Sequence, residues 1–170
     1  GVYRWDRVNN WSGDATPEAT DDVVLDRSSA DDEDGSPHSP HGVTVQVRDP
    51  ETVQSLSIAG HENGDLTTTF DLNDNTLTLS NAGATAFEIE TDQSLTIGQG
   101  TLLIIGNSII SGTLIISADA NVVFQGNVDF TGGTVMSDAD GSDVPTITFD
   151  AAAAGANIAV DSGMSMDGVV

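Results

Sequence analysis

Three aspartates, Asp138, Asp140 and Asp143, have the residue type and spacing best suited to chemistry in this sequence. Carboxylates at alternate or near-alternate positions around a glycine can surround a hard cation, and Ca²⁺ is bound by about six to eight oxygen ligands. The segment differs from an EF-hand loop, because Phe149 stands where that loop has its final glutamate. We predict a calcium site within residues 138–143, with a solvated turn as the alternative.

Two weaker groups of polar residues also suit a metal ion. Asp71, Asn73 and Asn75 repeat the alternation of oxygen ligands, and we predict them as a second Ca²⁺ candidate. His38 and His41 could hold a transition metal. Histidines in a polar loop usually have no ligand, and we favour that interpretation for this pair.

The remaining residues give little support to catalysis. The chain has no cysteine and no Gly-x-Ser-x-Gly motif. Glu88, Glu90 and Asp129 fall on predicted strands or directly beside them, where paired carboxylates could process a polysaccharide. No Arg or Lys follows Arg48, however, and an uncompensated acidic face would repel an acidic sugar. We predict that the protein is not an enzyme; the alternative is a carbohydrate-binding or polysaccharide-processing β-helix, such as part of a viral tail fibre or spike.

The charge balance excludes several partners. The 170 residues include 27 Asp and Glu against four Lys and Arg, for a net charge of −23. Nucleic acids and anionic membranes both require a basic surface, so neither is expected as a partner. Repulsion within the chain has to be relieved by salt or bound cations, which favours a secreted or cell-surface protein in a saline environment. The longest apolar runs are far shorter than the ~20 residues of a membrane-spanning helix.

Short strands are predicted along most of the chain. Thr, Val and Ile are plentiful and helix-favouring residues are scarce, a composition typical of strands joined by tight turns. Apolar and polar residues alternate, so one face of each strand is expected to be buried. The predicted strands are 21–25, 43–47, 53–58, 66–70, 76–79, 87–89, 95–97, 102–105, 108–110, 114–116, 122–124, 128–130, 134–136, 147–149 and 158–160.

The spacing of these strands predicts the architecture. Leu56, Leu77, Leu95, Leu114 and Val135 recur at intervals close to 20 residues, with Gly, Asn, Asp or Ser where corners are needed. Three short strands in each such interval describe one triangular coil of a parallel β-solenoid. We predict an all-β fold of this kind, with outer faces that present ladders of Thr, Ser and Asn. An antiparallel β-sandwich or jelly roll is the alternative, although its strands are usually longer.

The N-terminal part differs from the rest of the chain. It contains both tryptophans, Trp5 and Trp11, which we interpret as a hydrophobic cap on an otherwise aromatic-poor solenoid. Residues 27–42 contain no large apolar side chain and are expected to form an acidic loop. We therefore divide the chain into a cap strand and loop, 1–42, and a single unit of coils, 43–170.

The segments RWDRVNNWSG (Arg4–Gly13), DDVVL (Asp21–Leu25) and VQSLSI (Val53–Ile58) carry a resemblance to a known family. They resemble the start of secreted bacterial parallel β-helices of the autotransporter-passenger or adhesin type. This resemblance implies a right-handed β-helix at the cell surface with a structural or adhesive role. The segment Gly106–Leu114 is more faintly similar to bactofilins, which polymerise end to end.

The C-terminal part predicts self-association. It stays apolar in pattern up to the last residue, and its two aspartates are the only charges there. Because an uncapped solenoid end exposes unpaired strand edges, either the chain continues or this end pairs with a second subunit. We predict assembly of copies into a fibre or surface layer, with surface polysaccharide as a second partner. The predicted interface consists of Ile158, Val160, Met164, Met166, Val169 and Val170.

Overall fold

The computed structural model describes residues 2–25, 42–60, 67–137 and 145–150, together with the backbone of 158–159 and 166–167. This part of the chain is all-β apart from one short 3-10 turn, η1 (Val8–Asn10). The strands are β1 (Val2–Arg4), β2 (Asp22–Leu25), β3 (Val43–Gln46), β4 (Glu51–Val53), β5 (Ser55–Ile58), β6 (Thr67–Asp71), β7 (Thr76–Ile89), β8 (Ser94–Ile97), β9 (Gly100–Ile110), β10 (Thr113–Ile116), β11 (Ala120–Phe124), β12 (Val128–Asp129), β13 (Thr134–Ser137), β14 (Thr146–Phe149), β15 (Ile158–Ala159) and β16 (Met166–Asp167).

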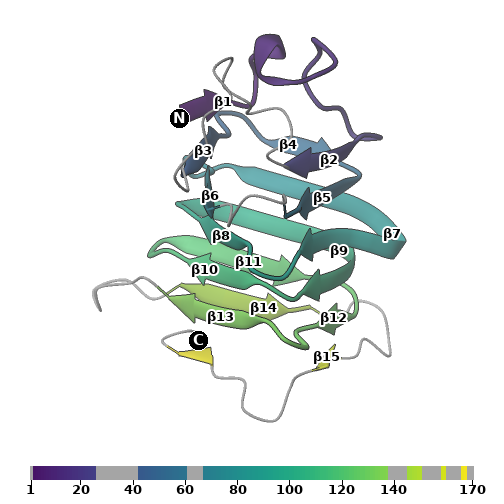
Figure 1. Ribbon diagram of the computed structural model, residues 1–170, viewed down its shortest axis with the longest axis vertical. Helices are drawn as coiled ribbons and strands as arrows, with labels where there is room; N and C mark the ends of the chain where they lie inside the picture. The colour runs from purple at the N-terminus through teal and green to yellow at the C-terminus, as the bar shows by residue number, and fades with distance from the viewer. Residues whose placement is uncertain are drawn as a thin grey trace.

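Every strand pairing in the described chain is parallel, and the strands form three rows (Figure 1). The first row is the seven-stranded sheet β1-β3-β6-β8-β10-β13-β16. The second row contains β4, β11 and β14 with the first halves of β7 and β9; the third contains β2, β5, β12 and β15 with the second halves of β7 and β9. From β3 onward the chain passes from the first row to the second, then the third, and returns. The prediction of an all-β parallel fold is confirmed, and the antiparallel sandwich is wrong.

The core lies between the three rows and is built from stacked, in-register apolar side chains. Along the first row, Val45 pairs with Phe70, Phe70 with Ile97, and Ile97 with Ile116. All four side chains are buried, whereas the residues beside them in the sequence point outward. The alternation of apolar and polar residues therefore reports correctly which side of each strand faces the core.

The register corrects part of the predicted spacing. Leu95 pairs with Leu114 and Leu114 with Val135, at the predicted offsets of 19 and 21 residues. Leu56 instead pairs with Phe87 in the third row, and Leu77 with Leu102 in the second row. The interpretation of these five positions as one column of the solenoid is therefore wrong. Each row has the same alternating pattern, so the sequence alone does not show to which row a strand belongs.

Some predicted strand boundaries also change. Residues 53–58 were predicted as one strand, but the chain bends at Gln54 and β4 and β5 belong to different rows. Conversely, the segments predicted at 102–105 and 108–110 form a single strand, β9, which turns from the second row to the third near Gly106. Gly106 has φ of +149°, a backbone conformation that residues with a Cβ rarely adopt.

Glycines at the corners allow successive coils to lie in contact. A Cβ at Gly126 would fall within the van der Waals radius of the carbonyl oxygen of Gly106, one coil earlier. A Cβ at Gly133 would meet the carbonyl oxygen of Ile110 in the same way. Residues 126–127 and 132–133 lie in the turns before β12 and β13.

The N-terminal segment contributes strands to the same rows. β1 pairs with β3, so that Tyr3 lies beside Val45, and β2 pairs with β5, so that Val23 lies beside Leu56. Residues 2–25 thus add two strands to the stack. The predicted acidic loop, residues 27–42, lies outside the described residues except for Gly42.

One core position predicts a stabilising substitution. Thr68 is fully buried between Val43 and Leu95, and its hydroxyl has no hydrogen-bond partner among the described residues. Burying an unpaired hydroxyl costs about 1–3 kcal/mol. We therefore expect Thr68→Val, measured by urea unfolding, to raise the free energy of unfolding by about 1 kcal/mol. The neighbouring, outward-facing Thr69→Val should change it by less than about 0.5 kcal/mol, and a destabilised Thr68→Val would contradict the assignment.

Candidate functional site

The predicted calcium site at Asp71, Asn73 and Asn75 is a corner between the first and second rows. Asn73 has φ of 47°, a left-handed conformation that Asn tolerates better than most residues. Its side-chain amide donates to the carbonyl oxygen of Val47 at 3.1 Å, in the preceding coil, and the amide of Asn75 donates to the carbonyl oxygen of Asn73 at 3.1 Å. Gln46 donates to the carboxylate of Asp71 at 3.3 Å. These contacts hold one coil to the next, and calcium binding here stays a prediction.

The other predicted metal ligands lie outside the described residues: Asp138, Asp140, Asp143, His38 and His41. Among the residues that are described, no group of three or more His, Asp or Glu is placed to hold a metal ion. None of the described residues forms a helix long and apolar enough to cross a bilayer.

The carboxylates considered for polysaccharide chemistry are spread over the third row. Glu88 and Asp129 both occupy outward columns, but Ile109 of β9 lies between them. Glu90 accepts a hydrogen bond from the backbone N–H of Gly60 at 2.8 Å. The side chain and backbone N–H of Thr131 donate to Asp129 and lower its pKa. Each of these acids therefore has a separate local environment.

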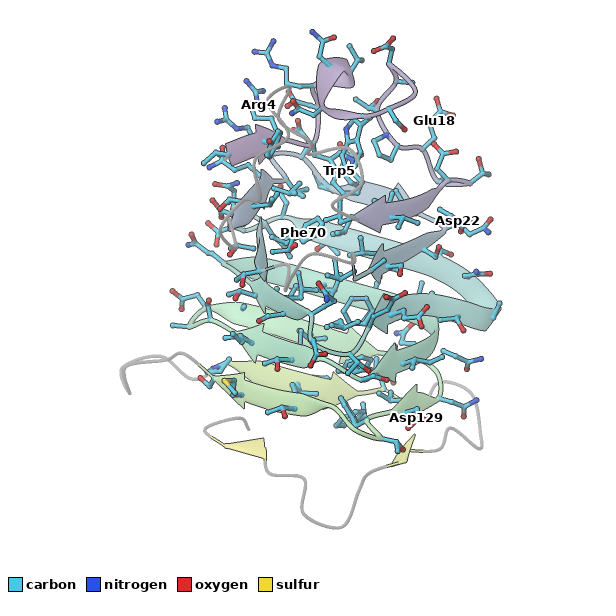
Figure 2. All side chains as sticks on the ribbon, in the orientation of Figure 1. Arg4, Trp5, Glu18, Asp22, Phe70 and Asp129 are labelled. Atoms are coloured by element: carbon cyan, nitrogen blue, oxygen red, sulfur yellow. The ribbon has the colours of Figure 1, made fainter. Side chains whose placement is uncertain are left out.

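The two tryptophans lie at the N-terminal end of the core. Trp5 is 1% exposed and its ring centroid is 6.1 Å from that of Phe70 (Figure 2). Trp11 packs edge-on against Trp5 at 5.0 Å and donates its indole N–H to the carbonyl oxygen of Trp5 at 2.9 Å. The segment between β1 and β2 lies over this end of the stack (Figure 1). This end of the apolar core is therefore covered by the chain itself.

Acidic side chains gather at the same end. Burial, followed by the nearby charges of Asp49 and Asp6, raises the pKa of Glu51. Within the described part of the chain, the guanidinium of Arg4 forms an ion pair with the carboxylate of Asp6. Arg48 donates to the side-chain oxygen of Gln46 at 3.1 Å. Arg4 and Arg48 thus lie at the end of the stack where Glu51, Asp49 and Asp6 come close together.

The other end of the described stack presents an apolar strand edge. Among the described strands, β14 is the last of the second row and pairs with β11 alone. Phe149 stacks on Phe124 at 5.5 Å, with an angle of 13° between the rings, and remains 37% exposed. Sequence reasoning placed Phe149 in a strand but did not identify it at an exposed end.

The residues predicted as an assembly interface are mostly outside the described part. The backbones of Ile158 and Met166 belong to β15 and β16, which pair with β12 and β13. Val160, Met164, Val169 and Val170 are not among the described residues. Their role in an interface stays a prediction.

The outward positions of the first row form two hydroxyl-rich columns. Thr67, Ser94, Thr113 and Thr134 pair in succession, each with the next. Two residues further along the strands, the second column consists of Thr44, Thr69, Thr96, Ile115 and Met136. The sequence predicted polar ladders on the outer faces. Outward threonines also occur in the second row, as at Thr76, Thr78 and Thr101.

Comparison with known proteins adds no relative. No family model, curated protein or solved structure matches this chain.

Proposed function

We propose that the chain is a non-enzymatic, extracellular structural or adhesive β-solenoid that associates with its own copies through its C-terminal end. The observation that supports this most is the stack itself, in which in-register parallel strands continue from a covered end to an exposed apolar edge. Repeats that contact only their neighbours form stiff, elongated units that suit a mechanical or presenting role. The function follows from shape and surface rather than from a cluster of reactive groups.

The proposal includes the handedness of the solenoid and the size of its coils. Parallel strands joined by a crossover are right-handed in about 98% of known cases, which favours a right-handed solenoid. The offsets of 19 and 21 residues in the first row favour triangular coils of about 20 residues in the centre of the molecule.

The charge supports an extracellular, saline location. The net charge is −23, and 17 acidic residues follow Arg48 without another Arg or Lys. High ionic strength shortens the Debye length to about 8 Å at physiological salt and to about 3 Å at 1 M, which reduces such repulsion. Bound Ca²⁺ at residues 138–143 would have the same effect locally, and we retain it as part of the proposal.

Association through the C-terminal end is favoured by the contrast between the two ends. Trp5 and Trp11 cover the core at the N-terminal end, whereas Phe149 is partly exposed at the other. Pairing of like ends would give a closed dimer, and head-to-tail pairing would give the fibre predicted from the sequence. The covered N-terminal end favours the dimer, because a fibre would require the tryptophan segment to move.

The test is a charge placed on the exposed edge. We expect light scattering at high salt to show a dimer or larger species for the wild-type protein and a monomer for Phe149→Lys. Association would bury the lysine charge, which is energetically costly. Thr148→Lys makes the same charge change on the outward side of β14 and should leave the mass unchanged. A wild-type protein that remains monomeric at high concentration and high salt would contradict the association.

A further inference from the structure

The outer side of the first row is rich in hydroxyl groups, and its strands β3, β8, β10 and β13 contain no charged residue. We call it the hydroxyl face and define it by the outward-pointing residues Thr44, Thr67, Thr69, Ser94, Thr96, Thr113 and Thr134. They lie on five strands, β3, β6, β8, β10 and β13, which are stacked one below another in Figure 1. All seven side chains are exposed or half-buried.

The geometry of the hydroxyl face is regular. Neighbouring strands are about 4.8 Å apart, and residues two positions apart on a parallel strand are about 6.6 Å apart. Six of the seven residues are threonines, whose branched Cβ restricts the side chain to few rotamers. No side-chain hydrogen bond between described residues involves these hydroxyls, so they are available to an outside partner. The face therefore presents an ordered array of hydroxyl and methyl groups.

Charge is excluded from most of this array. Strands β8, β10 and β13 contain no charged residue, although the chain has 27 acids. Acids instead occupy the adjoining turns, as Asp74, Asp92 and Asp119 do, each with a left-handed backbone. A cationic partner would gain little electrostatic attraction from the uncharged centre of the face. An anionic partner, or a second copy of this acidic chain, would be repelled by the acidic turns. An electrically neutral partner fits best.

The side-chain chemistry distinguishes between neutral partners. Sugar-binding surfaces commonly combine aromatic rings with planar amide or carboxylate groups; the outward positions of β8, β10 and β13 have only Thr, Ser, Ile and Met. Hydroxyls can join a lattice of ordered water through hydrogen bonds, and methyl groups order the water around them.

We propose that the hydroxyl face binds ice. The proposal rests on the adhesive role argued above and names crystalline water as the surface that is bound. Rigid coils fix the hydroxyl positions before contact, so little conformational entropy is lost on binding. The acidic turns on both sides stay hydrated and disfavour stacking of the face on another copy.

The test compares matched lysine variants of the full chain. Ice recrystallisation inhibition and thermal hysteresis are measured for wild type, Thr96→Lys, Thr113→Lys and Ser57→Lys. Ser57 is a half-buried outward residue of β5 in the third row, so it receives the same side chain away from the hydroxyl face. We expect wild type and Ser57→Lys to be equally active in both assays, and both threonine variants to lose most of this activity.

Thermal unfolding and circular dichroism establish that each variant is folded. Thr96→Val, which keeps the shape and removes one hydroxyl, provides a second variant that does not introduce bulk or charge. The proposal is overturned if folded wild type has no effect on ice, or if both lysine variants equal wild type. Retention of wild type on neutral cellulose or dextran that Thr96→Lys abolishes would assign the face to a polysaccharide instead. Light scattering on the Phe149→Lys protein tests end-to-end association independently of either result.

Discussion

Gly126→Ala is expected to lower the free energy of unfolding by about 3 kcal/mol, the upper part of the range for overpacking. The added methyl group would overlap the carbonyl oxygen of Gly106, which belongs to the backbone of the preceding coil. A flexible side chain could move away at small cost, but this backbone is fixed by strand pairing on both sides. The coils would have to separate locally. Urea unfolding followed by circular dichroism measures the change.

Gly13→Ala provides the matched control for this substitution. A Cβ at Gly13 would have no atom within 4 Å, and this glycine does not have a positive φ. Its replacement should change the free energy of unfolding by less than about 0.5 kcal/mol. Equal unfolding midpoints for Gly126→Ala and wild type would show that successive coils are not in backbone contact at this corner.

Trp5→Ala is expected to lower the free energy of unfolding by about 3–5 kcal/mol, as is typical for truncation of a buried aromatic residue. Trp5 is 1% exposed, packs on Phe70 and is covered by Trp11. Its removal would leave a cavity at the end of the core that water can enter. Because each coil contacts only its neighbours, hydrogen exchange should increase more in β3 and β6 than in β10 and β11.

Tyr3→Ala is the control for a lost aromatic side chain in the same segment. Tyr3 is 44% exposed, so its truncation should cost about 1 kcal/mol. A uniform rise in hydrogen exchange over all strands of Trp5→Ala would contradict the nearest-neighbour description. If Trp5→Ala lowers the free energy of unfolding only as much as Tyr3→Ala does, Trp5 does not close this end of the core.

Much of the fold could be predicted from local pattern. Alternation such as Leu95-Thr96-Ile97 identifies both the strand and its buried side, because the backbone pleat points successive side chains to opposite faces. Corner residues such as Gly126 are recognisable because a backbone in close contact excludes a Cβ. Both signals depend on a few consecutive residues.

Pairing across coils could not be predicted in the same way. Leu56 was aligned with Leu77 and Leu95, yet its partner is Phe87, because corners of different length separate the coils. The hydroxyl face could not be predicted from the sequence for the same reason. Thr67, Ser94 and Thr113 lie far apart in the sequence, and only the register brings them into one column. Candidate sites on a single turn, such as 71–75, could be named from sequence, but the role of Asn73 in joining two coils could not.

Unequal offsets along the first row have a consequence for how such a protein can evolve. Thr44 and Thr69 pair at an offset of 25 residues, and Thr96 and Ile115 at 19, yet both pairs belong to one continuous sheet. The additional residues are accommodated between strands, where doubling a loop costs only about 0.6 kcal/mol in closure entropy. Corners can therefore gain or lose residues while the strands keep their register. A foreign peptide inserted at the exposed bulge around Gly83, where a Cβ would meet no atom within 4 Å, should be displayed without disturbing the scaffold.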